Sequence, residues 1–285
     1  EIYQCTFSKN NGDQNTGGRS NTDSKGGAIY VNAPTASVSI RKSLFDGNEA
    51  GTGGAIYYVS GTSTRSSSET LLDTAEEDKQ YSLHAVDCKF ISNTASSDGS
   101  SIYISVGDVA GHKPVDINNC IFLSNEATSN GCIYYTFESS QITTDASKFL
   151  FRVTNCRFEE NKESSIYISI TKDDPSNTIE ITNCHFYQNT ATKQGSNIYY
   201  QSTSTSTTPA STNPTLQINQ CDFSDTLTDT EESGSVSITF PNAGTRSVKI
   251  NECTFKGSIK NSLFVKSEQK KRYIISFVYI YCNNS

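Results

Sequence analysis

The sequence lacks an excess of positive charge, and this argues against nucleic acids and anionic lipids as partners. Its 23 Lys and Arg residues stand against 30 Asp and Glu residues, which gives a formal net charge of −7 at pH 7. Proteins that bind nucleic acid generally carry a basic face, and anionic lipid surfaces attract basic segments. We therefore predict no nucleic-acid partner and see no reason to expect electrostatic attraction to lipid.

Long apolar runs are missing as well. The run at residues 273–281 has about half of the roughly 20 residues that a membrane-spanning helix needs, so we expect a final strand there. The sequence thus predicts no membrane insertion within this segment. A repeat begins almost at once at Cys5, and Cys282 opens an unfinished one. We expect one repeat domain over residues 1–285, an excerpt of a longer protein.

Patterns that carry catalysis or metal binding are not found in the sequence. It has no C-x-x-C pair, no Gly-rich phosphate loop and no nucleophile elbow. Acidic residues are scattered, and the pairs at 173–174 and 231–232 fall in expected loops or turns. His84, His112 and His185 share no position in the repeat. We predict a protein that is not an enzyme, with no catalytic residues, no metal site and no cofactor.

What the sequence does contain is a repeat that runs from one end to the other. Its first motif, C-x-F-x-x-N, occurs at residues 5–10, 88–93, 120–125, 156–161 and 184–189. A copy at 43–48 has Ser in place of Cys, and two degenerate copies at 221–226 and 253–258 lack the final Asn. Its second motif, G-G-A-I-Y, is intact at 26–30 and 53–57 and is followed by decayed copies at 99–103, 130–134, 163–167 and 195–199. A third run, such as Val115-Asp116-Ile117, precedes each Cys and alternates with period two.

Each repeat therefore contains three short strands, V-x-I, C-x-F and G-x-I-Y, rich in β-branched and aromatic residues. A three-strand unit cannot bury its apolar face alone, whereas stacked copies can. We predict an all-β fold, a right-handed parallel β-helix of the pectin-lyase type. It should have about eight coils of three short strands, and successive coils should lie about 4.8 Å apart.

Stacking in register predicts a role for each motif residue. The Phe residues should form an internal aromatic ladder. The Asn that closes each motif should take the left-handed backbone of a sharp turn and hydrogen-bond from coil to coil. The Gly residues before Ile should accept backbone angles that other residues refuse. The variable spacers, longest near 60–80 and 202–214, should emerge along one edge of the rod.

The nine cysteines invite a disulfide interpretation. Seven share one position of the motif, and Cys132 lies in a third strand. A ladder of buried thiols acting as small hydrophobes explains this repetition. Parallel side-chain directions would strain a disulfide between neighbouring coils, but isolated bridges remain an alternative if the protein is extracellular.

These motifs resemble the F-x-x-N and G-G-A-[ILV] repeats of chlamydial polymorphic membrane proteins and of similar surface proteins of parasitic protists. The resemblance covers nearly the whole chain, and its intact copies pair 7–10 with 26–29 and 45–48 with 53–56. It implies a β-helix on a cell surface or outside the cell, used in adhesion or immune variation, with a host or cell-surface protein or glycan as partner. The repeated Cys before Phe departs from the chlamydial pattern and favours the protist-like relatives.

Alternation in the third strand suggests one candidate binding surface. If the Ile residues face inward, the Tyr residues that follow them face outward and form an exposed stripe. Tyr is enriched in recognition surfaces, so the stripe could bind a glycan or a protein. The alternative is coil-to-coil stacking that only makes the sheet rigid. The stripe consists of Tyr30, Tyr57, Tyr103, Tyr134, Tyr167 and Tyr199.

Three functions remain open at this stage, because one fold hosts many functions. The first is a non-enzymatic surface module for adhesion or ligand interaction. The second is a carbohydrate-active enzyme, a polysaccharide lyase or hydrolase, on the same fold. The third is a structural spacer. Acidic residues clustered in one groove would favour the enzyme. An exposed Tyr stripe with loops of unequal length would favour the binding module. A surface without such features would favour the spacer.

Overall fold

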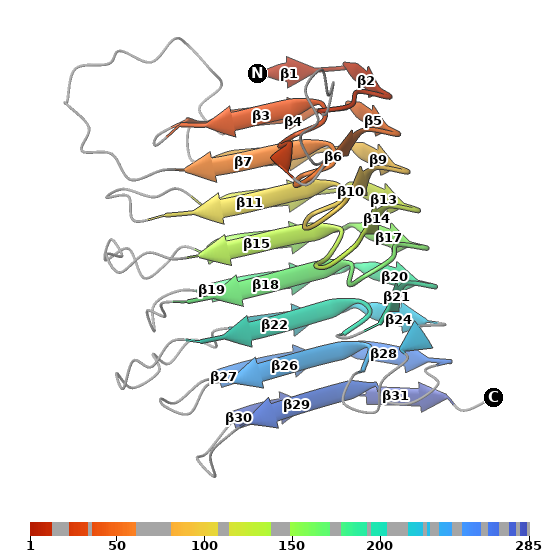
Figure 1. Cartoon of the computed structure of the whole chain (residues 1–285). Coiled ribbons are helices and arrows are strands. Elements are labelled where there is room, and N and C mark those ends of the chain that lie inside the picture. Colours follow the sequence, from red (N-terminus) through yellow and green to blue (C-terminus); the bar gives the residue numbers. More distant parts are fainter. Residues whose placement is uncertain are drawn as a thin grey trace, which may run out of the picture.

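The computed structural model describes residues 1–12, 23–33, 36–60, 81–107, 114–137, 149–171, 178–192, 195–203, 216–224, 227–228, 234–240, 247–257, 262–267, 274–277 and 280–283. The named elements in these residues are all β-strands. Among the described residues no helix is long and apolar enough to cross a membrane. The chain forms a rod of stacked coils with its two termini at opposite ends (Figure 1).

Three parallel sheets make up the walls of the rod. The first sheet contains β1 (Ile2–Tyr3), β4 (Val38–Arg41), β8 (Leu83–Val86), β12 (Val115–Asn118), β16 (Phe149–Thr154), β19 (Thr178–Thr182), β23 (Leu216–Asn219), β27 (Ser247–Asn251) and β30 (Ile274–Phe277). The second contains β2 (Thr6–Ser8), β5 (Leu44–Asp46), β9 (Lys89–Ile91), β13 (Ile121–Leu123), β17 (Arg157–Glu159), β20 (His185–Tyr187), β24 (Asp222–Ser224), β28 (Cys253–Lys256) and β31 (Ile280–Asn283). The third contains β3 (Ile29–Asn32), β7 (Ile56–Ser60), β11 (Ile102–Val106), β15 (Ile133–Phe137), β18 (Ile166–Ile170), β22 (Ile198–Ser202), β26 (Val236–Phe240) and β29 (Leu263–Ser267).

Short strands that the sequence did not predict lie between the second and third sheets. They are β6 (Glu49–Ala50), β10 (Thr94–Ala95) and β14 (Glu126–Ala127) in one group, and β21 (Thr190–Ala191) and β25 (Leu227–Thr228) in another. Each of them directly follows a copy of the first motif and contains only two residues, one of them apolar. A run this short carries no readable period, so sequence reasoning missed it.

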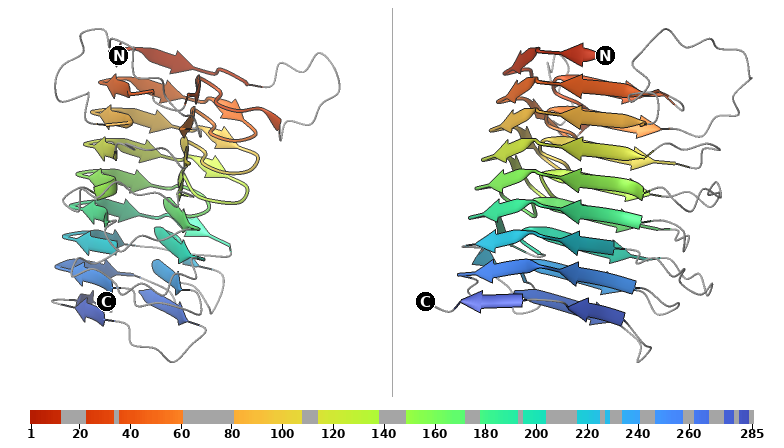
Figure 2. Two further views of the ribbon diagram at one scale, coloured as in Figure 1. Left: turned by 90° about the vertical axis from the view of Figure 1, so that its left-hand side faces the viewer. Right: turned by 180° about the vertical axis from the view of Figure 1, so that it is seen from behind.

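The strands pair in parallel, and like residues lie over like residues. Phe122, for example, is in register with Phe90 on one side and Phe158 on the other. This register confirms the predicted right-handed parallel β-helix of about eight coils (Figures 1 and 2). The consequence is that every motif position becomes a column of equivalent side chains along the rod.

The Phe column forms the centre of the core. Neighbouring rings from Phe7 to Phe255 stack with centroids 4.7–5.0 Å apart and planes within 12° of parallel. Phe45 to Phe186 are fully buried. Burying one such ring contributes about 1.5–3 kcal/mol from its area alone, and parallel displaced rings add about 0.5–1.5 kcal/mol per pair.

The Asn column is a second ladder and confirms the predicted coil-to-coil hydrogen bonds. The backbone N and the side-chain Nδ2 of Asn93 both donate to Oδ1 of Asn125, at 2.9 and 3.0 Å. Nδ2 of Asn93 also donates to the carbonyl of Phe45 at 3.0 Å. The same pattern joins Asn48, Asn93, Asn125, Asn161 and Asn189. Each buried amide is thus satisfied without water.

The predicted backbone conformation of these Asn residues is wrong. The residue before each Asn takes the left-handed angles instead, with φ of 53° at Ser92 and Ser124 and 54° at Glu160. That residue points to solvent, so its type varies. The left-handed turn directs the following Asn side chain into the rod, where the ladder needs it. The motif itself does not indicate whether the Asn or the residue before it takes the left-handed backbone conformation.

The corner between the first and second sheets is nearly constant in length. In it a left-handed residue, such as Asp87 with φ 56° or Asn119 with φ 52°, precedes the Cys. The Cys therefore lies in the corner rather than in the strand, except at Cys253, which starts β28. Between the second and third sheets, Gly53 and Gly99 have φ of 64° and 65°, as the sequence predicted for this corner.

The length differences between coils fall mainly where the third sheet returns to the first. The connections there are residues 33–37, 61–82, 107–114, 138–148, 171–177, 203–215, 241–246 and 268–273. They join strand ends that lie along one edge of the rod (Figure 2). The predicted spacer segments at 60–80 and 202–214 fall largely outside the described residues.

Candidate functional site

The Tyr stripe lies on the outer face of the third sheet. Ile102, Ile133 and Ile166 point inward and are fully buried, and the Tyr residues that follow them are in register along the sheet. The rings stack from Tyr30 to Tyr167 with centroids 4.9–5.3 Å apart and planes within 20° of parallel. The last pair, Tyr167 and Tyr199, is tilted by 35°. The outward direction agrees with the alternation of the strand, and the stacking is the arrangement that the sequence analysis gave as the alternative to a binding surface.

The stripe is less exposed than the alternation of the strand suggested. Tyr30 is 53% exposed, whereas Tyr57 and Tyr167 are 9% and 5% exposed. Tyr103, Tyr134 and Tyr199 are half-buried. The cause is the stacking itself, because each ring covers the face of the next. What the stripe offers to a partner is therefore ring edges and phenol oxygens, and its binding role remains a prediction.

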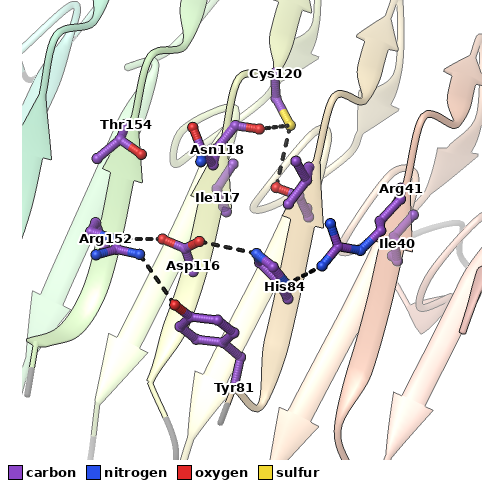
Figure 3. Close-up of polar contacts among 12 residues, drawn as sticks. Ile40, Arg41, Tyr81, His84, Asp116, Ile117, Asn118, Cys120, Arg152 and Thr154 are labelled. Atoms are coloured by element: carbon purple, nitrogen blue, oxygen red, sulfur yellow. Dashed lines mark hydrogen bonds and ion pairs between the residues drawn. The ribbon is translucent and has the colours of Figure 1, made fainter. Parts of the chain in front are cut away.

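A second polar group, which the sequence did not predict, lies on the outer face of the first sheet. Asp116 in β12 is in register with His84 in β8 and with Arg152 in β16. The carboxylate is almost fully buried, with 1% of the residue exposed. Figure 3 shows the three side chains converging, with Arg41 beyond His84 and the Tyr81 ring below Asp116.

Each carboxylate oxygen of Asp116 has its own partner. Oδ1 accepts a hydrogen bond from Nε of Arg152 at 2.6 Å, and Oδ2 lies 3.2 Å from Nε2 of His84. An Nη of Arg152 reaches the Tyr81 hydroxyl at 3.3 Å, and the Tyr81 ring packs on the His84 ring with centroids 4.5 Å apart. Nδ1 of His84 faces an Nη of Arg41 at 3.5 Å. The interactions run continuously across four coils.

The neighbouring charges and hydrogen bonds shift the pKa values of Asp116 and Arg152. Burial alone would raise the pKa of Asp116, but the hydrogen bonds from His84 and Arg152 and the charge of Arg152 outweigh it and hold the pKa below its usual value. Burial alone would lower the pKa of Arg152, and the hydrogen bond and charge of Asp116 raise it instead. At neutral pH the pair is therefore ionised.

This arrangement joins coils and does not resemble a catalytic centre. Both oxygens of Asp116 are occupied, and both ring nitrogens of His84 face a partner, so neither is placed as a general base toward a substrate. Aligning the first-strand runs by their positions would have put His84, Asp116 and Arg152 in one column. The irregular spacers between the runs hide that column from a reading of the chain in order.

The cysteines are a ladder of free thiols, as the repetition predicted. Among the eight cysteines whose side chains the structure describes, none is in a disulfide; Cys5 is exposed and the other seven are buried. Sγ of Cys120 lies 3.3 Å from the carbonyl of Asn118 and accepts from the backbone N of Cys88 at 3.4 Å. Within the described residues no group of three His, Cys, Asp or Glu side chains is arranged to hold a metal ion.

Comparison with known proteins finds a family model that matches a short stretch of the chain. No curated protein and no solved structure matches the chain. The model of the Chlamydia polymorphic membrane protein (Chlamydia_PMP) repeat matches residues 42–58. This stretch spans β5, β6 and most of β7 and contains Phe45, Asn48 and the glycine corner at 53–54. Residues 42–58 are therefore similar to the polymorphic membrane protein repeat, as the F-x-x-N and G-G-A-I motifs indicated.

Proposed function

We propose that this chain is a cell-surface β-helix module that binds a host or cell-surface protein or glycan and catalyses no reaction. The observation that carries the proposal is the division between a repeated interior and one variable edge. The Phe, Asn and Cys columns repeat along the rod, while the connections from the third sheet to the first range from residues 33–37 to residues 61–82. Binding residues are commonly placed on loops that a rigid scaffold positions.

The polymorphic membrane protein repeat at 42–58 supports a location at the cell surface. The Tyr stripe supports a second binding face, near the start of the third-sheet strands whose other ends lead into the variable connections. The charged group around Asp116 gives the enzyme alternative no support, because its functional atoms already face one another. A structural spacer would have the same rod and no binding partner.

The test is a binding experiment on the whole chain with two kinds of variant. The chain is labelled and applied to host cells and to a glycan array. One variant carries Tyr103→Ser and Tyr134→Ser on the stripe; the other replaces residues 61–80 by a short Gly/Ser linker. Lys89→Ser, exposed on the second sheet, serves as the matched control, and circular dichroism checks that each variant is folded.

We expect measurable binding that the linker variant or the stripe variant reduces and that Lys89→Ser leaves unchanged. Absence of binding to every cell type and glycan would favour the spacer. Release of unsaturated sugar products from polygalacturonate in a parallel assay would establish the enzyme and overturn the proposal.

A further inference from the structure

The backbone amide of Gly131, in the glycine corner, differs from the corner amides of the coils before it. The preceding corner glycines all donate to the next coil: Gly26 N to Thr52 O at 3.0 Å, Gly53 N to Asp98 O at 3.0 Å and Gly99 N to Asn130 O at 2.9 Å. Within the described part of the chain, the structure records no hydrogen bond from Gly131 N, although Gly131 is buried. A buried N–H without an acceptor is uncommon.

The cause lies in the next coil, which is shorter at this corner. Residues 160–165 link β17 to β18, whereas residues 124–132 link β13 to β15 and include β14. The shorter link is also irregular, with φ of 57° at Glu163 and 22° at Ser164. Because Ile133 is in register with Ile166, Glu163 takes the position of Asn130 in this coil, and within the described residues no hydrogen bond from Gly131 N to its carbonyl is recorded. Lys162 is paired instead with Glu126, and its carbonyl accepts from Ala127 N at 3.4 Å.

The residue before this amide is an asparagine whose side chain is held in place. Nδ2 of Asn130 donates to Oδ1 of Asp98 at 2.8 Å, and the two residues form a parallel bridge between coils. Asn130 is half-buried and follows the exposed Thr128 and Ser129, so water can reach it. An Asn-Gly pair allows cyclisation most easily, because Gly has no Cβ to hinder the ring.

From this geometry we infer that Asn130 is a site of spontaneous deamidation in the folded protein. The nitrogen of Gly131 attacks Cγ of Asn130 and loses its proton to solvent. The side-chain nitrogen takes up a proton and leaves as ammonia, which closes a five-membered succinimide. Water then opens either carbonyl of the ring and gives Asp or isoaspartate. The net reaction consumes one water and releases one ammonia.

The product places a second carboxylate against Asp98. The hydrogen bond from Asn130 to Asp98 becomes a contact between like charges, which is destabilising when the two residues are directly opposite. Isoaspartate also inserts an extra backbone carbon at the bridge. The modification therefore loosens the contact between the coils of β11 and β15.

The chain contains its own comparator. Asn11 is also followed by Gly and also donates to a carboxylate of the next coil, Oε2 of Glu49 at 3.4 Å. The amide of Gly12, however, donates to the Glu49 carbonyl at 2.9 Å. Breaking that hydrogen bond must precede attack, so folding should slow the reaction at Asn11 more than at Asn130.

The experiment incubates the whole chain, folded and in urea, at mildly alkaline pH. Peptide mapping by mass spectrometry follows conversion at both sites, and isoaspartyl methyltransferase labelling detects the isoaspartate. The quantity measured at each site is the rate of deamidation in the folded chain divided by the rate of deamidation in urea. Asn130→Gln, which would need a six-membered ring, confirms the assignment of the peptide.

We expect this ratio to be close to one at Asn130 and severalfold lower at Asn11. A ratio at Asn130 that is suppressed by an order of magnitude, or that is no higher than the ratio at Asn11, would overturn the inference. Because each site is compared with itself in urea, differences in peptide recovery do not affect the outcome.

Discussion

Arg152, half-buried, and Asp116, buried, form an ion pair between adjacent coils although they are 36 residues apart in the chain. Their atoms Nε and Oδ1 lie 2.6 Å apart. The net contribution of such an ion pair to the free energy of folding is often small. Removing one partner is costly all the same, because it leaves the other charge buried and uncompensated.

The first prediction concerns that pair. Arg152→Met should lower the free energy of unfolding by about 3–5 kcal/mol, because it leaves the Asp116 carboxylate with only His84. The double variant Arg152→Met/Asp116→Leu should recover a large part of the loss. Urea denaturation measures both values. A single variant as stable as the parent would show that the carboxylate is already solvated.

The second prediction concerns pH. The folded-state pKa of Asp116 is depressed, so its contribution is fully present above the unfolded value of about 3.9 and is lost as the pH falls through the folded value. The difference in unfolding free energy between the parent and Asp116→Asn should shrink as the pH falls below about 4, where the carboxyl group becomes protonated first in the unfolded chain. A difference that stays constant into strong acid would contradict this assignment.

The third prediction concerns the Phe column. Phe122→Ala should cost about 3–5 kcal/mol of unfolding free energy, because it opens a cavity between Phe90 and Phe158 in a closely packed ladder. Leu123→Ala, next in the chain and half-buried on the outer face, is the control and should cost much less. Equal losses would mean that the interior column is not the main source of stability.

The fourth prediction concerns the Asn ladder. Asn125→Ala removes the oxygen to which the backbone N and the Nδ2 of Asn93 donate, and a buried group left unsatisfied costs about 1–3 kcal/mol. Asn219→Ala is the matched control, since its Nδ2 makes one longer hydrogen bond, to Thr182 Oγ1 at 3.4 Å. We expect the ladder variant to melt at a clearly lower temperature than this control.

The fifth prediction uses the thiols as reporters of folding. Cys5 is exposed, whereas Cys132 is buried, and burial raises its thiol pKa to about 12. Because the thiolate is the reactive form, an alkylating reagent should modify Cys5 at once and Cys132 only as urea unfolds the chain. Peptide mapping separates the sites. Rapid labelling of Cys132 in the native protein would indicate local opening of its coil.

The sequence was sufficient to predict the features that repeat. Phe122 and Asn125 recur at fixed positions of their motif, so their columns followed from stacking alone. Asp116 could not be found in this way, because its partners His84 and Arg152 are different residue types separated by spacers of unequal length. The left-handed residue before each Asn was also missed, because that position tolerates Ser, Glu, Lys and Gly and so leaves no conserved letter within the chain.

The exposure of the Tyr stripe was overestimated for a related reason. The period of two correctly gave its direction, but it says nothing about what neighbouring coils do to one another. Tyr57 has a stacked ring on each side, from Tyr30 and Tyr103, and is buried on a face that points outward. Coil-to-coil contacts are properties of the stack and have no counterpart in a single strand.

The Asn ladder also makes the rod directional. From Asn48 to Asn161, each side-chain Nδ2 donates to the Oδ1 of the Asn in the next coil toward the C-terminus, and each Oδ1 from Asn48 onward accepts from the coil before it. The same Nδ2 also donates back to a Phe carbonyl of the preceding coil. If a gene duplication added one more coil, its Asn would therefore find an Asn acceptor in the coil on its C-terminal side and an Asn donor in the coil on its N-terminal side. The neighbouring coils would need no change. Tandem duplication can lengthen such a protein coil by coil, whereas a coil inserted in the reverse sense would set donor against donor.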